Sequence, residues 1–377
     1  MKLSNDIVKY IEEHYDEAYD LLITLAKIPA PSNHEEKRAD FCKKWLVDQG
    51  AKGVYIDEAL NVVFPLGCKE DNDVVVYMAH SDVVFPDTEP LPLTVEDGKI
   101  FCPGVGDDTA NVIALLMSAK YIIENDLQPK NEGILFVVNS GEEGLGNLKG
   151  SKKIVEDFGK RIKEFITFDG YSTAMHNKSV GSKRYLVEIE TEGGHSYGAF
   201  GNRNAIAYMA SLISTLYDMK VPEKGKTTYN VGTIEGGTSV NTIAQYAKML
   251  YEFRSDEKES LEIMEKHFEA AIEFYKNKGI KVTCTLVGNR PCMADVDQKA
   301  LDTLVQRGFN AIKNNYKIDS DFTPGSTDCN IPLSQGIPAV CMGCINGGKA
   351  HTREEYIEID SILPGIKTAF EMVLYHF

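Results

Sequence analysis

The sequence lacks the long apolar runs that mark membrane proteins. No stretch approaches the roughly 18 consecutive apolar residues of a membrane-spanning helix. The start, MKLSNDIVKYIEEHYDEAYDLL, is rich in acids and has no apolar core of the signal-peptide type. Eight cysteines in 377 residues are about 2% of the chain, far below the share found in a disulfide scaffold. These absences predict a cytoplasmic protein with reduced thiols.

Positive charge is also scarce, since 40 lysines and arginines face 56 aspartates and glutamates, which gives a net charge of −16. This balance argues against nucleic acid and anionic membranes as partners. The acids are spread along the chain without a like-charge tail, so most of them form solvated surface and a minority remain for a cation site. The length suggests two domains.

Buried strands alternate with helices in the outer parts of the sequence. The stretch VVVYMAHSDVV (74–84) begins as a strand buried on both faces, and similar apolar runs follow at 133–140, in FITF before Asp169, and in GIPAVCMG (336–343). This alternation predicts an α/β fold with a mostly parallel sheet. Three strands end in polar side chains, at His80 and Asp82, at Glu142 and Glu143, and at Asp169. Such strand ends are where open α/β sheets bind ligands.

The pattern changes near Gly181, where KRYLVEIETE (183–192) alternates as a half-exposed strand does. The order of elements that follows is βαββαβ, which is typical of a ferredoxin-like α+β domain. We therefore predict a catalytic domain in two parts, 1–180 and 291–377, interrupted by an inserted lid domain at 181–290.

Helical spacing of apolar residues predicts one helix over residues 6–27. Ser32 followed by Glu35 has the spacing of a capping box, which predicts that Ser32 caps a second helix running to about Gln49. Likewise, Asp107 and Asp108 stand where a helix N-cap would favour aspartate.

Candidate metal ligands come from separate segments. They are His80, Asp107, Glu142, Glu143, Asp169 and His351. Mixed sets of histidine and carboxylate suit zinc and other first-row divalent cations. Two such cations about 3.5–4 Å apart can activate water and polarise a carbonyl group. A glutamate beside them is then needed for proton transfer, so Glu142 and Glu143 can divide the two tasks.

Taken in order, the polar motifs resemble those of the M20 family of metallopeptidases and aminoacylases, and in particular its peptidase T-like members, the tripeptide aminopeptidases. The resemblance spans nearly the whole chain. The motifs are HSDVV (80–84), GVGDDTAN (104–111), NSGEEGLG (139–146), FDG (168–170), GGHSYG (193–198), GGTSVN (236–241), EFRSD (252–256), GSTDCN (325–330) and GGKAH (347–351).

This resemblance implies a role for each matching position. His80 and Asp169 bind one metal ion, Glu143 and His351 bind the other, and Asp107 bridges both. Asp82 orients His80, and Glu142 is the general base and acid. In the lid, His195 stabilises the oxyanion, often from a partner subunit. Substrate contacts fall on Asn241, Arg254, Gly325, Ser326 and Thr327, with Arg254 suited to pairing with a carboxylate.

The resemblance also implies a cofactor and partners. The cofactor is a pair of divalent ions, Zn²⁺ first, with Co²⁺ or Mn²⁺ as alternatives. The substrate is a small peptide, with an N-acyl amino acid as the near alternative, and the lid forms a homodimer. Two remoter interpretations are a non-catalytic metal-binding protein and a redox protein using Cys341 and Cys344, although buried thiols explain that pair as well.

The chain departs from the family pattern at one position next to the bridging aspartate. The family usually has a lysine two residues after that aspartate, and this chain has Thr109 there. The metal-binding role implied for Asp107 does not need the lysine, but the local support that the lysine gives must come from elsewhere.

Overall fold

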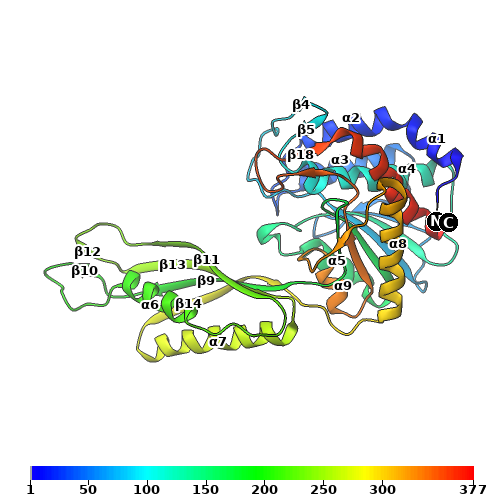
Figure 1. The fold of residues 1–377 in the computed structure, drawn as a ribbon. Coiled ribbons are helices and arrows are strands. Elements are labelled where there is room, and N and C mark those ends of the chain that lie inside the picture. The colour runs from blue at the N-terminus through cyan, green and yellow to red at the C-terminus, as the bar shows by residue number, and fades with distance from the viewer. Residues whose placement is uncertain (1) are drawn as a thin grey trace. The chain divides into compact units, whose positions relative to one another are not determined.

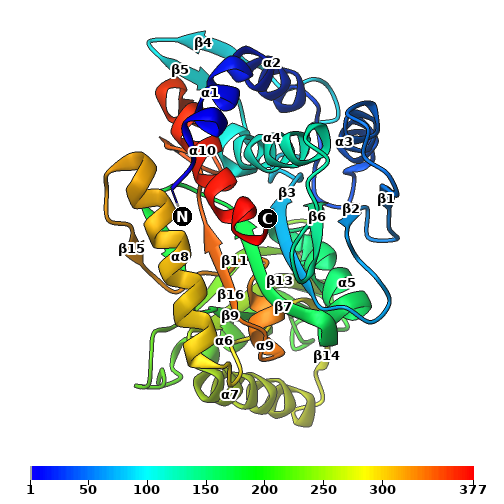
Figure 2. The ribbon, with the colours of Figure 1, turned by 90° about the vertical axis from the view of Figure 1, so that its right-hand side faces the viewer.

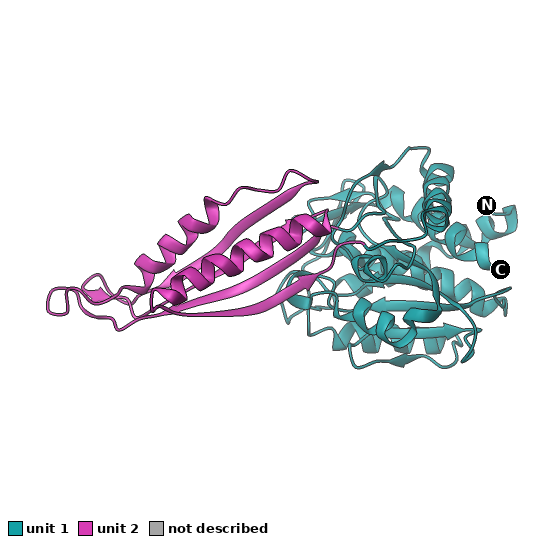
Figure 3. Cartoon of the chain, turned by 90° about the horizontal axis from the view of Figure 1, so that it is seen from below, with its two compact units in different colours: residues 1–179, 294–377 teal, residues 180–293 magenta. Residues whose placement is uncertain are grey.

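A computed structural model describes residues 2–377, which fold into two compact units. Unit 1 comprises the chain up to Ser179 together with Ala294–Phe377, and unit 2 is Val180–Met293; Figure 3 colours them teal and magenta. None of the helices between residues 2 and 377 combines the length and apolar character that a membrane crossing requires.

The core of unit 1 is an eight-stranded sheet (Figures 1 and 2). In spatial order its strands are β1 (Tyr55–Ile56), β2 (Val62–Leu66), β6 (Gly133–Asn139), β3 (Val74–His80), β7 (Ile162–Phe168), β16 (Ala339–Met342), β8 (Ala174–His176) and β15 (Asp321–Phe322). The central strands β6, β3, β7 and β16 are parallel, and every residue of β3 and β6 is buried. The predicted mostly parallel α/β sheet is therefore confirmed.

Helices cover this sheet. They are α1 (Asn5–Glu13), α2 (Tyr15–Ala26), α3 (Glu36–Asp48), α4 (Ala110–Glu124), α5 (Lys149–Phe158), α8 (Gln298–Tyr316), α9 (Asn330–Ser334) and α10 (Ile362–Val373). α4 packs on β3, β6 and β7 and against α10, as Figure 2 shows. Because α4 is covered on so many sides, its Val112–Ala119 stretch is buried without interruption.

A smaller four-stranded sheet lies within unit 1. Its strands, in spatial order, are β17 (Gly347–Gly348), β18 (Tyr356–Glu358), β5 (Lys99–Phe101) and β4 (Thr94–Glu96). Strands of two or three residues carry too little periodic pattern to be recognised. This sheet joins the segment after His351 to the segment before Asp107 through the pairing of β18 with β5.

Two expectations for the N-terminal helices are wrong. The single helix predicted at residues 6–27 is two helices, α1 and α2, which meet at His14. The capping box is also wrong, because α3 begins at Glu36 and no side chain caps it. The Ser32 hydroxyl instead donates to Asp82 Oδ2 at 2.7 Å, so a tertiary contact takes the group that a local cap would have used.

Unit 2 has the ferredoxin-like order predicted for the lid. Its sheet runs β11 (Thr227–Gly236), β13 (Tyr246–Ser255), β9 (Gly181–Glu190), β14 (Lys281–Arg290), all antiparallel, and its helices are α6 (Ala205–Tyr217) and α7 (Lys258–Asn277). A two-stranded ribbon, β10 (Gly194–His195) with β12 (Thr242–Ile243), completes it. Alternate residues of β9 and β13, such as Tyr185, Val187, Tyr251 and Phe253, join α6 and α7 in one apolar core.

Candidate metal centre

The centre begins at His80, the last residue of the buried strand β3. Its side chain is 1% exposed, and its Nε2 lies 3.0 Å from Asp107 Oδ1 and 3.9 Å from Asp169 Oδ1. Asp107 comes from the π-helical turn η1 (Val105–Thr109), and Asp169 follows β7 directly. Two neighbouring parallel strands and one turn therefore bring an imidazole and two carboxylates to one edge of the sheet.

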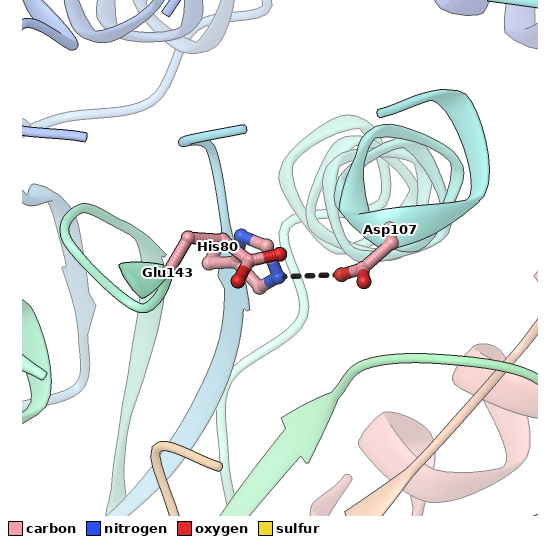
Figure 4. Close-up of side chains that lie close together, drawn as sticks. All are labelled: His80, Asp107 and Glu143. Carbon is pink, nitrogen blue, oxygen red and sulfur yellow. Dashed lines mark hydrogen bonds and ion pairs between the residues drawn. The ribbon is translucent and has the colours of Figure 1, made fainter. Parts of the chain in front are cut away.

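A second imidazole uses the other oxygen of Asp107. His351 Nε2 lies 3.1 Å from Asp107 Oδ2 and 2.8 Å from Glu143 Oε1. Glu143 follows the end of β6, and Figure 4 shows its carboxylate and that of Asp107 approaching His80 from different directions. One carboxylate is thus shared between two groups of ligands, with one oxygen directed to each histidine.

These residues suit a divalent cation. One candidate group of ligand atoms consists of His80, Asp107 and Glu143, and another of His80, Asp108 and Asp169; within each group all ligand atoms lie within 4.8 Å of one another. Imidazole nitrogen and carboxylate oxygen are the ligands of catalytic zinc sites. The side chains here that could bind a metal ion are therefore His80, Asp107, Asp108, Glu143, Asp169 and His351.

Asp82 organises the peptide that carries both glutamates. Its carboxylate accepts hydrogen bonds from the backbone N–H groups of Glu142 at 3.0 Å and Glu143 at 2.9 Å. It also lies 3.5 Å from Nδ1 of His80, whose nearer partner is the Asp82 carbonyl oxygen at 3.0 Å. Burial opposes ionisation here, but hydrogen bonds from His80, Ser32 and the Glu143 N–H keep the pKa of Asp82 below its ordinary value. A charged Asp82 therefore fixes the His80 ring and the 142–143 peptide together.

The expectation that Asp107 or Asp108 caps the following helix is wrong. Neither side chain caps α4, and Asp108 Oδ2 accepts the His80 N–H at 2.9 Å while its Oδ1 accepts from Asn111 Nδ2 at 2.5 Å. The group that does cap the turn is Glu355, which accepts from the N–H groups of Gly104, Gly106 and Asp107 at 2.8–2.9 Å. The turn is therefore fixed by a carboxylate about 250 residues away in sequence, a relation that no local pattern could reveal.

Both histidines carry raised pKa values. Burial alone would lower the pKa of His80, but the charge of Asp108 and the hydrogen bonds with Asp107 and Asp82 raise it well above its ordinary value. Hydrogen bonds with Asp107 and Glu143 raise the pKa of His351 to about 11. Without metal, the His351 ring is therefore protonated at neutral pH, and the raised pKa of His80 favours the protonated form of that ring as well.

Metal binding near pH 7 is expected to release at least about two protons per chain, because His80 and His351 must become neutral to bind a cation. Asp169 adds to this number, because burial raises its pKa to about 7 and it must be ionised to bind. Affinity is then expected to weaken as the pH falls, since protons compete for the same nitrogens. Titration calorimetry with zinc in two buffers of different ionisation enthalpy measures the proton count. Heats that do not depend on the buffer would contradict this electrostatic interpretation.

Three residues predicted to serve the substrate lie in unit 2, where they occupy two different places. His195 and Asn241 lie together in the β10–β12 ribbon, because the Ser196 N–H donates to the Asn241 carbonyl oxygen at 2.9 Å. Arg254 lies at the far end of β13 and pairs with Glu252 through two hydrogen bonds of 3.0 and 3.1 Å.

The predicted pocket segment Gly325–Thr327 lies in unit 1, after β15. The Gly325 N–H donates to Lys178 O at 2.9 Å within the same chain, and a Cβ at Gly325 would come within 2.6 Å of the His176 ring. Thr327 accepts the Cys329 N–H at 3.2 Å. The adjoining Asp328 is 2% exposed and its charge contributes to the raised pKa of Asp169, whose main cause is burial, so this loop lies beside the candidate metal centre.

All eight cysteines are free thiols. Cys341 and Cys344 are each 1% exposed, and burial raises the pKa of both well above the ordinary value. A thiol of this kind is a poor nucleophile, because the thiolate is the reactive form. The buried-thiol interpretation of this pair is the one that the structure favours.

The sequence did not identify four residues as part of the centre, although their side chains support it. They are Ser32, Arg38, Asp108 and Glu355. All four act through contacts between distant segments, which only a folded chain reveals. Arg38 did leave a signal, since it shares a helical stripe with Cys42 and Leu46 at four-residue intervals, and an arginine on an otherwise apolar stripe is unusual.

The chain as a whole is similar to a family profile, to several curated proteins and to several solved structures. The profile described as peptidase family M20/M25/M40 matches residues 76–375. The uncharacterized protein YqjE of Bacillus subtilis is 24% identical over 93% of this chain and 95% of its own length. Succinyl-diaminopimelate desuccinylase of Nitrosomonas eutropha is 27% identical over 62% of this chain and 67% of its own. The crystal structure of a tripeptidase from Staphylococcus aureus has a TM-score of 0.76 at 22% identity, covering 95% of this chain and 97% of that one.

Proposed function

The chain belongs to peptidase family M20/M25/M40 and is a hydrolase of amide bonds, and on that premise we propose that it cleaves small peptides with two divalent cations, in the first place zinc. One observation carries the two-ion proposal. Asp107 directs one carboxylate oxygen to His80 and the other to His351, so two ligand groups share one carboxylate. A single-ion site has no need of that arrangement.

When bound, such ions would activate a water molecule and polarise the carbonyl group of the scissile amide. We assign the remaining chemistry to this chain's own side chains. Glu142 takes the proton from the attacking water and passes it to the leaving amine nitrogen. Its backbone N–H is held by Asp82, and its neighbour Glu143 is directed to His351. Two consecutive residues can therefore have separate roles, in which Glu143 binds a cation and Glu142 transfers the proton.

We propose a di- or tripeptide as substrate because the motifs resemble those of peptidase T-like enzymes. Arg254 would pair with the substrate's carboxylate, and its present pairing with Glu252 shows that its guanidinium can bind a carboxylate through two hydrogen bonds. Cleavage of N-acyl amino acids is the second candidate. It is favoured by the similarity to a desuccinylase, and it would use the metal ligands proposed above.

A substrate panel separates these two candidates. The zinc-loaded protein is expected to hydrolyse di- and tripeptides with free termini, and to hydrolyse N-acetyl and N-succinyl amino acids more slowly. Measurement of kcat/KM for each compound decides the question. A higher value for the N-acyl amino acids would make the protein a deacylase, and no turnover of either class would contradict both proposals.

We propose that His195 donates a hydrogen bond to the oxyanion that forms during attack. Its Nδ1 accepts from the backbone N–H groups of Tyr197 and Gly198, both at 3.3 Å. The neutral ring must therefore carry its proton on Nε2, and this N–H is directed away from those two contacts. Loss of one oxyanion donor costs about 10²–10³-fold in kcat, and we expect a loss of that size for His195→Ala.

We further propose that His195 serves the active site of a second copy. Within unit 2, His195 pairs with Thr242 just before β13 begins at Tyr246, and Arg254 lies near the other end of that strand. Eight residues of strand span about 26 Å, whereas a tripeptide extends only about 10 Å. One small substrate is therefore much shorter than the backbone distance between these two residues of one lid, which favours a contribution from a second copy.

The surface beside His195 suits a contact between copies. Tyr197, Phe200 and Val240 are 90%, 91% and 102% exposed on the same ribbon and its loops. Large apolar side chains grouped on an exposed tip are typical of protein interaction sites. We therefore place the proposed homodimer contact at the lid, with a second copy of this chain as the partner.

Mixing two inactive variants tests the dimer directly. In a heterodimer of Glu142→Ala with His195→Ala, one site combines an intact Glu142 with the intact His195 of the other copy. If the subunits exchange freely, an equimolar mixture is expected to regain about a quarter of the parent kcat, because half of the dimers are heterodimers and each has one working site. A mixture as inactive as its components, while size measurement shows heterodimers, would contradict a contribution from the partner copy.

We also propose a cytoplasmic location, which the free state of all eight cysteines supports. Fractionation of the natural host, followed by detection of the protein in each fraction, tests this proposal.

A further inference from the structure

Arg38 is an arginine completely buried directly behind the candidate metal centre. It lies in the first turn of α3 with 0% exposure. A buried guanidinium is costly to place, and proteins retain one only where hydrogen bonds and nearby negative charge compensate. Burial lowers the pKa of Arg38 to about 10, so the side chain stays charged at neutral pH.

The hydrogen bonds of Arg38 join three segments of the centre. Nε donates to Ile28 O at 2.8 Å, and Nη1 donates to Ser81 O at 2.9 Å and to Thr109 Oγ1 at 3.0 Å. Ser81 stands between His80 and Asp82, and Thr109 stands two residues after Asp107. One side chain therefore connects the end of β3 with the turn that carries the shared carboxylate.

The hydroxyl of Thr109 is fully used in this arrangement. It accepts from Arg38 and donates to Gly104 O at 2.6 Å. Position 109 is also where the sequence resemblance led us to expect a lysine. The structure thus has a neutral acceptor where a cation was expected, and a cation from another helix bonded to that acceptor.

The charge of Arg38 matters as well as its hydrogen bonds. Its four acceptors, Ala26 O included, are neutral oxygens. The groups that favour its charged form are the thiols of Cys42 and Cys102 and, after them, Asp82 and Glu355, two of the buried carboxylates around the centre. Arg38 is therefore placed to stabilise a group of carboxylates that would otherwise repel one another.

We propose that Arg38 is a positioning residue of the metal centre, and that it supplies from α3 the cation that the chain lacks at position 109. Arg38 does not contact the ions. It fixes the position of the end of β3 relative to the η1 turn, so that His80 and Asp107 can bind the same cation. This inference rests on the proposed two-ion function.

A double-mutant cycle over Arg38→Met and Thr109→Lys tests the exchange of one cation for the other. Arg38→Met is expected to weaken zinc binding about 10–100-fold, the usual effect of removing a partner behind the ligands. Thr109→Lys alone is also expected to weaken it, because a second buried cation then meets Arg38 and the hydroxyl acceptor is lost. The double variant is expected to bind zinc within about twofold of the parent. Zinc dissociation constants come from competition with a chromophoric chelator, and melting temperatures are measured on the same samples.

Arg161→Met is the matched control. Arg161 also lies in unit 1 and donates to the carbonyl oxygens of Asn72 and Lys69, away from the candidate centre. This variant is expected to lower the melting temperature and to leave the zinc dissociation constant unchanged.

The outcomes are distinct. Losses that multiply in the double variant, or an Arg38→Met protein that binds zinc like the parent, overturn the proposal. If Arg38→Met does not fold, recovery of a cooperative melting transition in the double variant supports the proposal, and a double variant that also fails to fold overturns it. A parent protein that binds no zinc contradicts the two-ion function itself, which is a different failure.

Discussion

Replacing Glu142 with alanine is expected to lower kcat about 10²–10⁴-fold, the range that general acid–base catalysis contributes, while both metal ions stay bound. The reason is that Glu142 and Glu143 have different proposed roles, proton transfer and metal binding. Glu143 lies 2.8 Å from His351, and the Glu142 peptide is held by Asp82 through its backbone N–H, which alanine retains. Steady-state kinetics and metal analysis of the same preparation measure both effects.

Glu371→Gln is a suitable control for this variant. Glu371 is also buried, at 4% exposure, but its partners are Asn314 and Asn315 in α8. Its replacement is expected to change stability and to leave kcat close to the parent value. Persistent turnover in Glu142→Ala would show that another group transfers the proton.

Replacing Asp107 with asparagine is expected to remove both metal ions, whereas replacing His351 with alanine is expected to remove one. Asp107 offers an oxygen to each histidine, so its loss deprives both ligand groups of a negative charge. His351 belongs to one group, and the other keeps His80 and Asp169. Metal content per chain, measured by mass spectrometry of desalted protein, separates the two variants.

His14→Ala provides the control for the second variant, because His14 contacts Tyr10 in the N-terminal helices. This variant is expected to keep two ions. Asp107→Asn and His351→Ala proteins with equal metal content would contradict the idea that one carboxylate is shared.

Much of the fold could be predicted because the strongest signals are long. Seven consecutive buried residues in β3, and seven more in β6, leave no polar alternation, which is the mark of a parallel sheet covered on both faces. The alternation of β9 likewise indicated a half-exposed sheet, and the ferredoxin-like order of unit 2 followed from it. Short strands such as β17 and β18 depend on tertiary pairing, and the sequence carries no pattern for them.

The site also has a part that the sequence could predict and a part that it could not. The side chains at or shortly after strand ends, His80, Glu143 and Asp169, were predictable as neighbours, because the ends of parallel strands meet at one edge. The groups that hold these side chains in position were not predictable. Ser32 had the spacing of a helix cap and proved to bond Asp82, and the η1 turn is capped by Glu355 rather than by its own aspartates. A local sequence pattern shows which polar groups a segment contains. Whether such a group forms a local cap or a tertiary hydrogen bond depends on the folded structure.

The most direct test of the two-ion hydrolase is to follow the turnover of a tripeptide as zinc is added to metal-free protein. The proposed function predicts almost no activity without metal, a rise with each addition, and a plateau at two equivalents per chain. Full activity in the presence of excess chelator, or a plateau reached at one equivalent, would contradict it.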